Sequence, residues 1–161
     1  MQSCIIGSAQ KTVTVPILSA LIYTFPMDKE QYIDTVACIF LKGGKVLSTR
    51  SRGKDTYYIP GGKRNGNETD EQVLIREIKE EVAVDLIPET VEYYGTFEAQ
   101  AHGRPEGIIV RMACYMADFS GEPEADSEKE EVVWLGYEGR EKSSSVDKLV
   151  FDDLKNKGFL A

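Results

Sequence analysis

Residues 61–84 read GGKRNGNETDEQVLIREIKEEVAV and join a glycine-rich loop to an acidic helical pattern. The loop is rich in glycine and asparagine, which adopt tight turns more readily than other residues. Thr69, with Gln72 three residues later, matches a capping box, and acidic residues occupy the first turn, where the helix dipole favours them. The stretch therefore predicts a turn-rich loop that leads directly into a helix.

The predicted helix has an apolar side and an acidic side, because successive residues are turned by about 100° around its axis. The apolar side consists of Leu74, Ile75, Ile78 and Val82. The adjoining side carries Glu77, Glu80 and Glu81. Exposed like charges at this spacing repel by roughly a few tenths of a kcal/mol per pair, and a hard divalent cation would remove that repulsion. The helix alone leaves two interpretations open, a metal site and a solvated acidic face.

The order of residues in this stretch resembles the Nudix box. The matching positions are Gly62, Glu68, Arg76-Glu77-Ile78 and Glu80-Glu81, and the lead-in Ile59-Pro60-Gly61-Gly62 is also similar to that family. A weaker resemblance extends from about Tyr32 to the end of the sequence. The loop and the helix together favour the metal site over the solvated face.

One fixed position differs from the family, which usually has glycine where this chain has Ala83. Because alanine is the better helix former, we expect a slightly longer or tighter helix end and an intact site. If the family's turn requires a positive φ, alanine puts that turn in doubt.

The resemblance implies a site for Mg²⁺ or Mn²⁺ built from the side chains of Glu77, Glu80 and Glu81 and the main-chain carbonyl of Gly61. A metal there would offset phosphate charge and activate a water for attack at phosphorus. Glu77 and Glu80 both remain candidates for the base that takes the proton, and Arg76 could orient a neighbouring carboxylate.

The resemblance also implies roles outside the metal site. Gly62 and Glu68 are expected to be structural, with Glu68 tying the loop to the helix start or to Arg76, and the alternative for Glu68 is a surface acid. The predicted substrate-binding residues are Arg50, Lys63, Tyr58 and Glu128, with Arg52, Lys54 and Arg64 as weaker candidates. Glu128 and Glu131 are also candidates for a further base or ligand, and His102 is a candidate general base whose alternative is a surface or substrate-gating position. The alternatives are surface charge for the basic residues, a mobile acidic loop for Glu128 and a core position for Tyr58.

Composition limits the partners of this 161-residue chain. Its net charge of −8 argues against nucleic acid polymers and anionic membranes, although a metal could still bring a nucleotide to it. The three cysteines follow no metal-binding pattern, and Cys38 and Cys114 lie in apolar runs. We therefore expect buried free thiols and a cytoplasmic location.

The chain is predicted to contain one domain, residues 27–161, after an N-terminal extension, residues 1–26, whose structure the sequence leaves open. Strands are expected at residues 32–41, 46–52, 56–59, 91–99, 108–119 and 131–137, and a second helix follows Ser143–Ser145 and ends at Gly158. This order predicts an α/β fold with a mixed sheet between helices. The resemblance implies the same architecture, a Nudix-type α/β/α sandwich.

The resemblance implies a divalent-metal-dependent pyrophosphohydrolase that cleaves a nucleoside diphosphate linked to some group X. Within that class we favour a MutT-like enzyme that converts a nucleoside triphosphate, including an oxidised one, to a nucleoside monophosphate and pyrophosphate. ADP-ribose or another dinucleotide is the alternative substrate. A non-catalytic nucleotide sensor and a cation-buffering protein are alternatives of other classes, and the complete glutamate set and the glycine-rich loop argue against them. Members of this family often dimerise, so a homodimer is one expected assembly.

Overall fold

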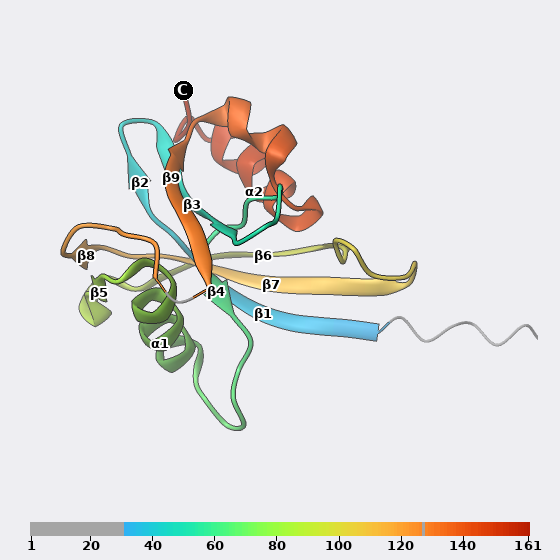
Figure 1. Ribbon diagram of the computed structural model, residues 1–161, viewed down its shortest axis with the longest axis horizontal. Coiled ribbons are helices and arrows are strands. Elements are labelled where there is room, and N and C mark those ends of the chain that lie inside the picture. The colour runs from blue at the N-terminus through green and yellow to red at the C-terminus, as the bar shows by residue number, and fades with distance from the viewer. Residues whose placement is uncertain (1–30, 127) are drawn as a thin grey trace, which may run out of the picture.

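The computed structural model describes residues 31–126 and 128–161 (Figure 1). The predicted extension, residues 1–26, lies outside the described residues. The strands are β1 (Gln31–Ile39), β2 (Leu41–Lys42), β3 (Lys45–Ser51), β4 (Gly61–Gly62), β5 (Asp85–Leu86), β6 (Glu92–Gln100), β7 (Ile108–Met116), β8 (Phe119–Ser120) and β9 (Lys129–Leu135). The helices are α1 (Asp70–Val82), α2 (Ser145–Asn156) and two short 3-10 helices, η1 (Pro88–Thr90) and η2 (Tyr137–Lys142).

The main sheet is mixed and has the strand order β4-β1-β7-β6. Strands β1 and β7 run parallel, whereas β4 and β6 pair with their neighbours in the antiparallel sense. A second, antiparallel sheet has the order β2-β3-β9, and β5 pairs with β8. Helices α1 and α2 lie on opposite sides of the strands, so the predicted α/β/α sandwich with a mixed sheet is confirmed (Figure 1).

Strand β1 lies at the centre because both of its faces are covered. Val36 and Cys38 belong to the core beneath α1, while Ala37 and Ile39 belong to the core beneath α2. All four are at most 1% exposed, which explains why this strand reads as a continuous apolar run and not as an alternating one. Cys114 on β7 is also buried, and both Cys38 and Cys114 are free thiols, as predicted.

Helix α1 begins with the predicted capping box, in which Thr69 and Gln72 each accept a hydrogen bond from the other's backbone N–H. Its buried side differs by one residue from the prediction. Ile75 is 40% exposed, and Val73 is buried in its place beside Leu74, Ile78 and Val82. Val73 and Ile75 both flank Leu74 and are both apolar, so helical spacing allowed either of them on the buried side. The packing of α1 against β1 and β5 buries Val73.

The end of α1 keeps a left-handed turn in spite of the alanine. The helix stops at Val82, and Ala83 has φ 58° and ψ 15°. Among the residues that the structure describes, Ala83 is the only one other than glycine with a positive φ. The expectation of a longer or tighter helix end was therefore wrong, because the chain must turn there to pair β5 with β8.

Four other predictions need correction. Residues 56–59 form isolated bridges at Tyr57 and Tyr58 and no continuous strand. Strand β7 ends at Met116, before the predicted residue 119, and β9 begins earlier than predicted, at Lys129. In α2, helical spacing predicts Val146, Leu149, Val150 and Leu154 on the buried side. Leu149 is instead 40% exposed, and Phe151 is buried with the other three. Ser144 caps α2, and Gly158 follows it with φ 80°.

Candidate active site

Two adjacent glycines bring the loop backbone against both β1 and α1. Gly61 has φ 155°, and a Cβ there would clash with the backbone of Val36 on the paired strand. A Cβ on Gly62 would clash with the carboxylate of Glu77. The backbone of β1 therefore requires glycine at position 61, whereas a side chain at position 62 would displace the carboxylate of Glu77, one of the predicted metal ligands.

Arg76 connects the loop to the acidic side of α1. Its Nε and Nη2 atoms donate to the two carboxylate oxygens of Glu68 at 2.8 and 2.7 Å, and Nη1 donates to Glu77 at 2.6 Å. Glu68 also accepts from the backbone N–H of Asn65 at 2.8 Å. These bonds, those from Arg76 first, lower the pKa of Glu68 to about 2. The predicted contact between Glu68 and Arg76 is thus present, and it fixes both the loop and Glu77.

Glu81 is paired with a residue that the sequence did not point to. Lys129, at the start of β9, places Nζ 2.7 Å from Oε1 of Glu81, and both side chains are nearly buried. The other oxygen, Oε2, accepts from the backbone N–H of Gly61 at 3.2 Å. Burial raises the pKa of Glu81, while Lys129 acts in the opposite direction.

The loop before β9 is attached to the end of α1, which explains how Lys129 reaches Glu81. The backbone N–H groups of Glu124 and Asp126 donate to the carbonyls of Val82 and Glu81 at 3.1 and 3.3 Å. These carbonyls belong to the last turn of the helix and have no partner within it. The acidic loop thereby satisfies the helix end and carries Lys129 to the site.

The three box glutamates are paired with two cations, Arg76 and Lys129. Glu77 bonds Arg76, Glu81 bonds Lys129, and Glu80 is 56% exposed with one 3.6 Å contact to Arg76. Within residues 31–126 and 128–161, no three acidic, histidine or cysteine side chains are already grouped as metal ligands. Their chemistry nevertheless fits a hard divalent cation, because all are carboxylates and Glu81 already takes a cationic partner. Glu81 would have to exchange that partner for a metal.

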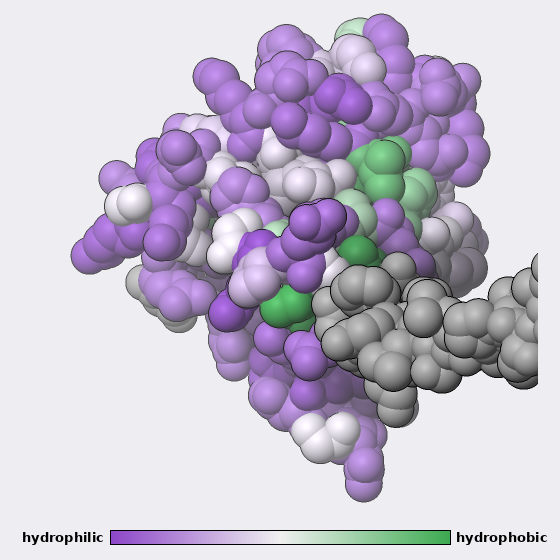
Figure 2. All heavy atoms as spheres, turned by 90° about the vertical axis from the view of Figure 1, so that its right-hand side faces the viewer, coloured by the Kyte–Doolittle hydropathy of each residue, from purple (hydrophilic) through white to green (hydrophobic). Residues whose placement is uncertain are grey.

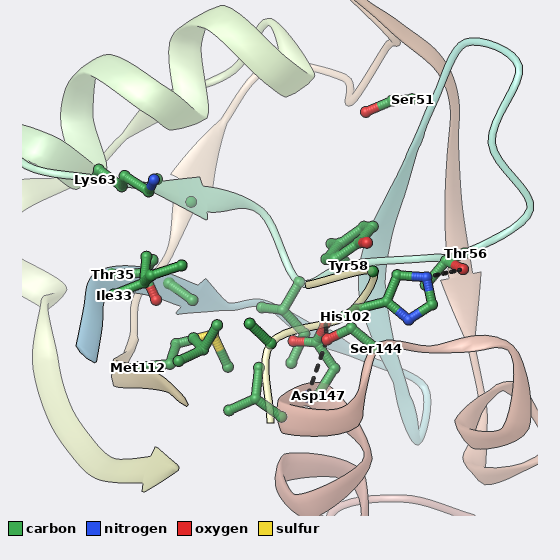
Figure 3. Close-up of a pocket in the computed structure, with 18 of the residues that line it drawn as sticks. Ile33, Thr35, Ser51, Thr56, Tyr58, Lys63, His102, Met112, Ser144 and Asp147 are labelled. Atoms are coloured by element: carbon green, nitrogen blue, oxygen red, sulfur yellow. Dashed lines mark hydrogen bonds between the residues drawn. The ribbon is translucent and has the colours of Figure 1, made fainter. Parts of the chain in front are cut away.

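A cavity of about 590 Å³ opens beside the glycine loop (Figure 3). Its lining includes residues of the box and its partner lysine, Gly61, Gly62, Lys63, Glu81 and Lys129. The rest is lined from β1, the segment between β3 and β4, β7, the loop after β6 and the start of α2, including Thr35, Tyr58, Val110, Met112, His102 and Asp147. From the right-hand side of Figure 1, hydrophobic residues show near the centre of an otherwise hydrophilic surface (Figure 2).

Asp147 lies in the wall of this cavity and is only 1% exposed. Its Oδ2 accepts from the hydroxyl of Ser144 at 2.7 Å, whereas Oδ1 makes no hydrogen bond. Burial raises the pKa of Asp147 to about 7, partly opposed by the Ser144 hydroxyl and the backbone N–H of Ile59. In the sequence this residue resembled an ordinary acid in the first turn of a helix.

Of the predicted substrate-binding residues, Lys63 and Tyr58 line the cavity, and Arg50 and Glu128 do not. Arg50 donates to Glu131 at 2.8 Å and to Glu130 at 3.1 Å, so its charge is already compensated. Glu128 is exposed and contributes its backbone carbonyl to Arg52. The prediction could not anticipate these partners because they depend on the pairing of β3 with β9.

The weaker candidates divide in the same way. Lys54 and His102 line the cavity, and the ring of His102 lies edge-on to Tyr58 with centroids 6.4 Å apart. His102 also places Nε2 3.3 Å from the hydroxyl of Thr56. Arg64 instead bonds Asp70 on α1. The residues that sequence reasoning missed are Lys129, Asp147 and Thr35, which stand apart from the box in the sequence.

Comparison with known proteins agrees with this geometry. The NUDIX domain family matches residues 31–149, which is more than half of the chain. A CTP pyrophosphohydrolase of Escherichia coli is 32% identical over 111 residues, covering 66% of this chain and 77% of that protein.

Solved structures share the fold. The E. coli ORF135 protein superposes with a TM-score of 0.63 at 25% identity, covering 83% of this chain and 98% of its own. A MutT protein from Methanosarcina mazei gives 0.65 at 18% identity, covering 80% of this chain and 96% of its own.

The chain therefore belongs to the Nudix family. Nudix enzymes are pyrophosphohydrolases, and this confirms the predicted enzyme class. Over the part of the chain that the structure describes, no helix is long and apolar enough to cross a membrane.

Proposed function

We propose that the protein hydrolyses a nucleoside triphosphate to a nucleoside monophosphate and pyrophosphate with the help of Mg²⁺ or Mn²⁺. The observation that carries this proposal is that the glycine loop and an apolar surface line one and the same cavity. The glycine loop, Lys63 and Glu81 line the same cavity as the apolar and aromatic side chains of Val110, Met112 and Tyr58. A triphosphate needs the first kind of surface and a nucleoside the second.

The metal would be held by Glu77, Glu80, Glu81 and the carbonyl of Gly61. When bound, it would neutralise phosphate charge and lower the pKa of a water molecule. Arg76 orients Glu77, and the Glu68 pair keeps that guanidinium in place. Lys63, which is exposed and lines the cavity with Gly61 and Glu81, supplies a positive charge for a phosphate oxygen.

We propose Glu80 as the group that receives the proton from the attacking water. The carboxylate of Glu77 is held by a 2.6 Å bond to Arg76, whereas the shortest contact between Glu80 and Arg76 is 3.6 Å. A base must be free to accept a proton, and strong pairing with a guanidinium disfavours protonation.

CTP is the first substrate to test, because the relative at 32% identity is named for it. The experiment is a hydrolysis panel with Mg²⁺ or Mn²⁺ that contains CTP, other nucleoside triphosphates, an oxidised dGTP, ADP-ribose and a dinucleotide. Release of monophosphate and pyrophosphate from a triphosphate supports the proposal. Exclusive hydrolysis of ADP-ribose or the dinucleotide would replace the substrate class.

One observation favours a second candidate, a nucleotide sensor without catalysis. Lys129 holds Glu81 in a nearly buried ion pair, so one predicted metal ligand is already occupied. A sensor would bind nucleotides and leave every member of the panel intact.

The buried thiols Cys38 and Cys114 support a reducing cytoplasm as the proposed location in both cases.

A further inference from the structure

The ammonium group of Lys129 lies in the wall of the cavity and relies on Glu81 to compensate its charge. Its side chain is 8% exposed, and Nζ lies 2.7 Å from Oε1 of Glu81 and 3.5 Å from the hydroxyl of Ser51. Only the first of these two contacts neutralises charge. A nearly buried ammonium group is stable only beside a compensating anion, because burial removes its water. A ligand that takes Glu81 away must therefore leave Lys129 with another anion.

The backbone around Lys129 is held in place. Its N–H donates to the carbonyl of Asp126 at 3.0 Å, and in the sheet Lys129 pairs with Ser51 of β3. The preceding carbonyl, that of Glu128, accepts from the N–H of Arg52 at 3.1 Å. Because these bonds hold the start of β9 against β3, the ammonium group changes partners by rotation of its own side chain. Lys129 therefore stays beside the cavity whichever partner it has.

A cation bound by Glu81 would need the oxygens that Lys129 and Gly61 engage in the structure. Oε1 is the partner of Lys129, and Oε2 accepts from the backbone N–H of Gly61 at 3.2 Å. An ammonium group so close to a divalent cation would be repelled strongly, because nearly buried charges are screened only weakly. Lys129 must then leave Glu81, and it needs an anion that arrives together with the cation.

A nucleotide brings such an anion into the same cavity. Gly61, Gly62 and Lys63 line the cavity together with Glu81 and Lys129, so a polyphosphate along the glycine loop shares it with this ammonium group. Lysine has three N–H donors, and its hydrogen bonds to phosphate are of the strong, charge-assisted kind. A phosphate oxygen can therefore replace the carboxylate as the anionic partner of Lys129.

We infer that Lys129 is a substrate-binding residue that exchanges partners. It pairs with Glu81 in the absence of ligands and with a phosphate oxygen of the nucleotide once a metal is held by Glu81. This inference rests on the proposed function for the identity of the ligand as a nucleotide. Only hydrogen bonds change in the exchange, and the ammonium group keeps its charge and its protons.

The exchange gives Lys129 opposite effects on the two ligands. It competes with a metal that binds alone, and it strengthens the binding of a nucleotide that arrives with the metal. A lysine with a purely structural role would support both ligands or neither. Two ligands that each free the partner of the other must bind cooperatively, because coupling between binding sites is reciprocal.

The test measures dissociation constants by calorimetric titration in the original protein and in Lys129→Met. The probe is the α,β-methylene analogue of the triphosphate that is hydrolysed fastest in the panel, or of CTP if none is hydrolysed, and it cannot be cleaved at that bond. With Mn²⁺ at saturation, Lys129→Met should bind the probe at least about tenfold more weakly, as expected for the loss of one charge-assisted hydrogen bond. Without nucleotide, the same variant should bind Mn²⁺ more tightly than the original protein.

A second pair of variants tests the exchange at Glu81. With metal removed by EDTA, Glu81→Gln should bind the probe at least about threefold more tightly than the original protein, because its neutral amide leaves the ammonium group to the phosphate. The loss of a nearby negative charge would by itself also favour the probe. The double variant Glu81→Gln/Lys129→Met separates these causes, because the gain should disappear there only if Lys129 provides it.

Lys79→Met is the matched control, because it removes an exposed lysine of α1 that pairs with Asp85. It should bind the probe as the original protein does. Melting curves confirm folding, and Lys129→Gln replaces Lys129→Met if the methionine variant does not fold. Three results would overturn the inference: unchanged binding of the probe by folded Lys129→Met, weaker binding of both the probe and Mn²⁺, or a gain that persists in the double variant.

Hydrolysis kinetics separate this inference from the proposed function. Binding of the probe that depends on Lys129 supports the inference even if no nucleotide is hydrolysed. Hydrolysis by Lys129→Met with the KM of the original protein would refute the inference and leave the proposed function standing. If the probe is not bound and no nucleotide is hydrolysed, both are refuted.

Discussion

At the scale of single residues, Ala83 combines a left-handed backbone with a side chain that disfavours it. Left-handed φ values cost an ordinary residue about 1–2 kcal/mol, and glycine is free of most of that penalty. We predict that Ala83→Gly raises the free energy of unfolding by roughly 1 kcal/mol and the melting temperature by a few degrees. Thermal unfolding measures the effect.

The control for this change is Ala125→Gly, in the exposed loop before β9, where φ is not positive. It should leave the melting temperature unchanged or lower it slightly, because glycine adds freedom to the unfolded chain. A lower melting temperature in Ala83→Gly than in the original protein would show that the alanine is not strained.

Asp147 should make stability depend on pH. Its pKa is raised from 3.8 to about 7 by burial, so the folded state holds the proton more tightly than the unfolded state. The free energy of unfolding therefore falls as the pH rises from about 4 to about 7 and stays low above that range. We predict that Asp147→Asn, which cannot ionise, melts several degrees higher than the original protein at pH 8 and gains much less at pH 5.

Other titrating groups near Asp147 do not imitate this effect. The pKa values of Tyr58 and Cys114 are raised by burial and by the charge of Asp147, so both stay neutral between pH 5 and pH 8. His102→Gln removes the single histidine of the chain and is the matched control. If the change in melting temperature between pH 5 and pH 8 disappears in His102→Gln and persists in Asp147→Asn, the histidine is responsible for it.

At the scale of elements, α1 carries the chemistry on one side and the core on the other. Glu80 is the most exposed of its three box glutamates, so its change should not disturb packing. We predict that Glu80→Gln lowers kcat by about 10²–10⁴-fold, the usual contribution of a general base, while the melting temperature changes by only a degree or two. Steady-state kinetics on the best substrate of the panel tests this.

Glu71→Gln, in the exposed first turn of the same helix, is its control and should retain full turnover. Hydrolysis by Glu80→Gln at the original rate would remove Glu80 from the mechanism. A large loss of kcat in both Glu80→Gln and Glu71→Gln would show that any loss of charge on α1 impairs turnover, and not the loss of Glu80 in particular.

Where β9 meets α1, Lys129 is paired with Glu81, so we predict that Lys129 competes with the metal for the carboxylate of Glu81. The ammonium group lies 2.7 Å from Glu81, and its removal eliminates a positive charge beside the predicted metal. At pH 8, Lys129→Met should lower the dissociation constant for Mn²⁺ about tenfold, which corresponds to about 1.4 kcal/mol of binding free energy. The repulsion between one ammonium group and a metal ion at this distance is large enough to account for that change. Calorimetric titration without nucleotide measures the affinity directly.

Lys79→Met is the corresponding control, because Lys79 is an exposed lysine on α1 that pairs with Asp85. It should change the affinity much less. Weaker Mn²⁺ binding in Lys129→Met would mean that Lys129 orients Glu81 and does not compete for it.

At the scale of the whole molecule, the sequence predicted what depends on neighbouring residues. Residues 61–84 contain three features that spacing along the chain was enough to predict. They are the glycines of the loop, the capping box at Thr69 and the pair of Glu68 with Arg76. The same reasoning predicted the apolar strands and the mixed sheet between two helices. These features depend on backbone propensity and periodicity, which a single sequence contains.

What the sequence could not provide depends on packing between distant elements. Lys129 reaches Glu81 only because the acidic loop binds the end of α1, and Arg50 is engaged only because β3 pairs with β9. Asp147 enters the cavity because α2 packs beneath β6 and β7, which buries the acid that a helix start would normally expose. In each case a long-range contact decides the partner of a charged side chain.

The parallel pairing of β1 with β7 has a consequence for biosynthesis. Gln31 pairs with Ile108 and Ile39 with Met116, so the first central strand leaves the ribosome long before its partner exists. During that interval α1 can already form through its own capping box, while the apolar edge of β1 stays open. Contacts so distant in sequence slow folding and expose nascent chains to aggregation. Co-translational collapse should therefore come late, once residue 116 has emerged, and chaperones that shield apolar nascent segments should act before that point.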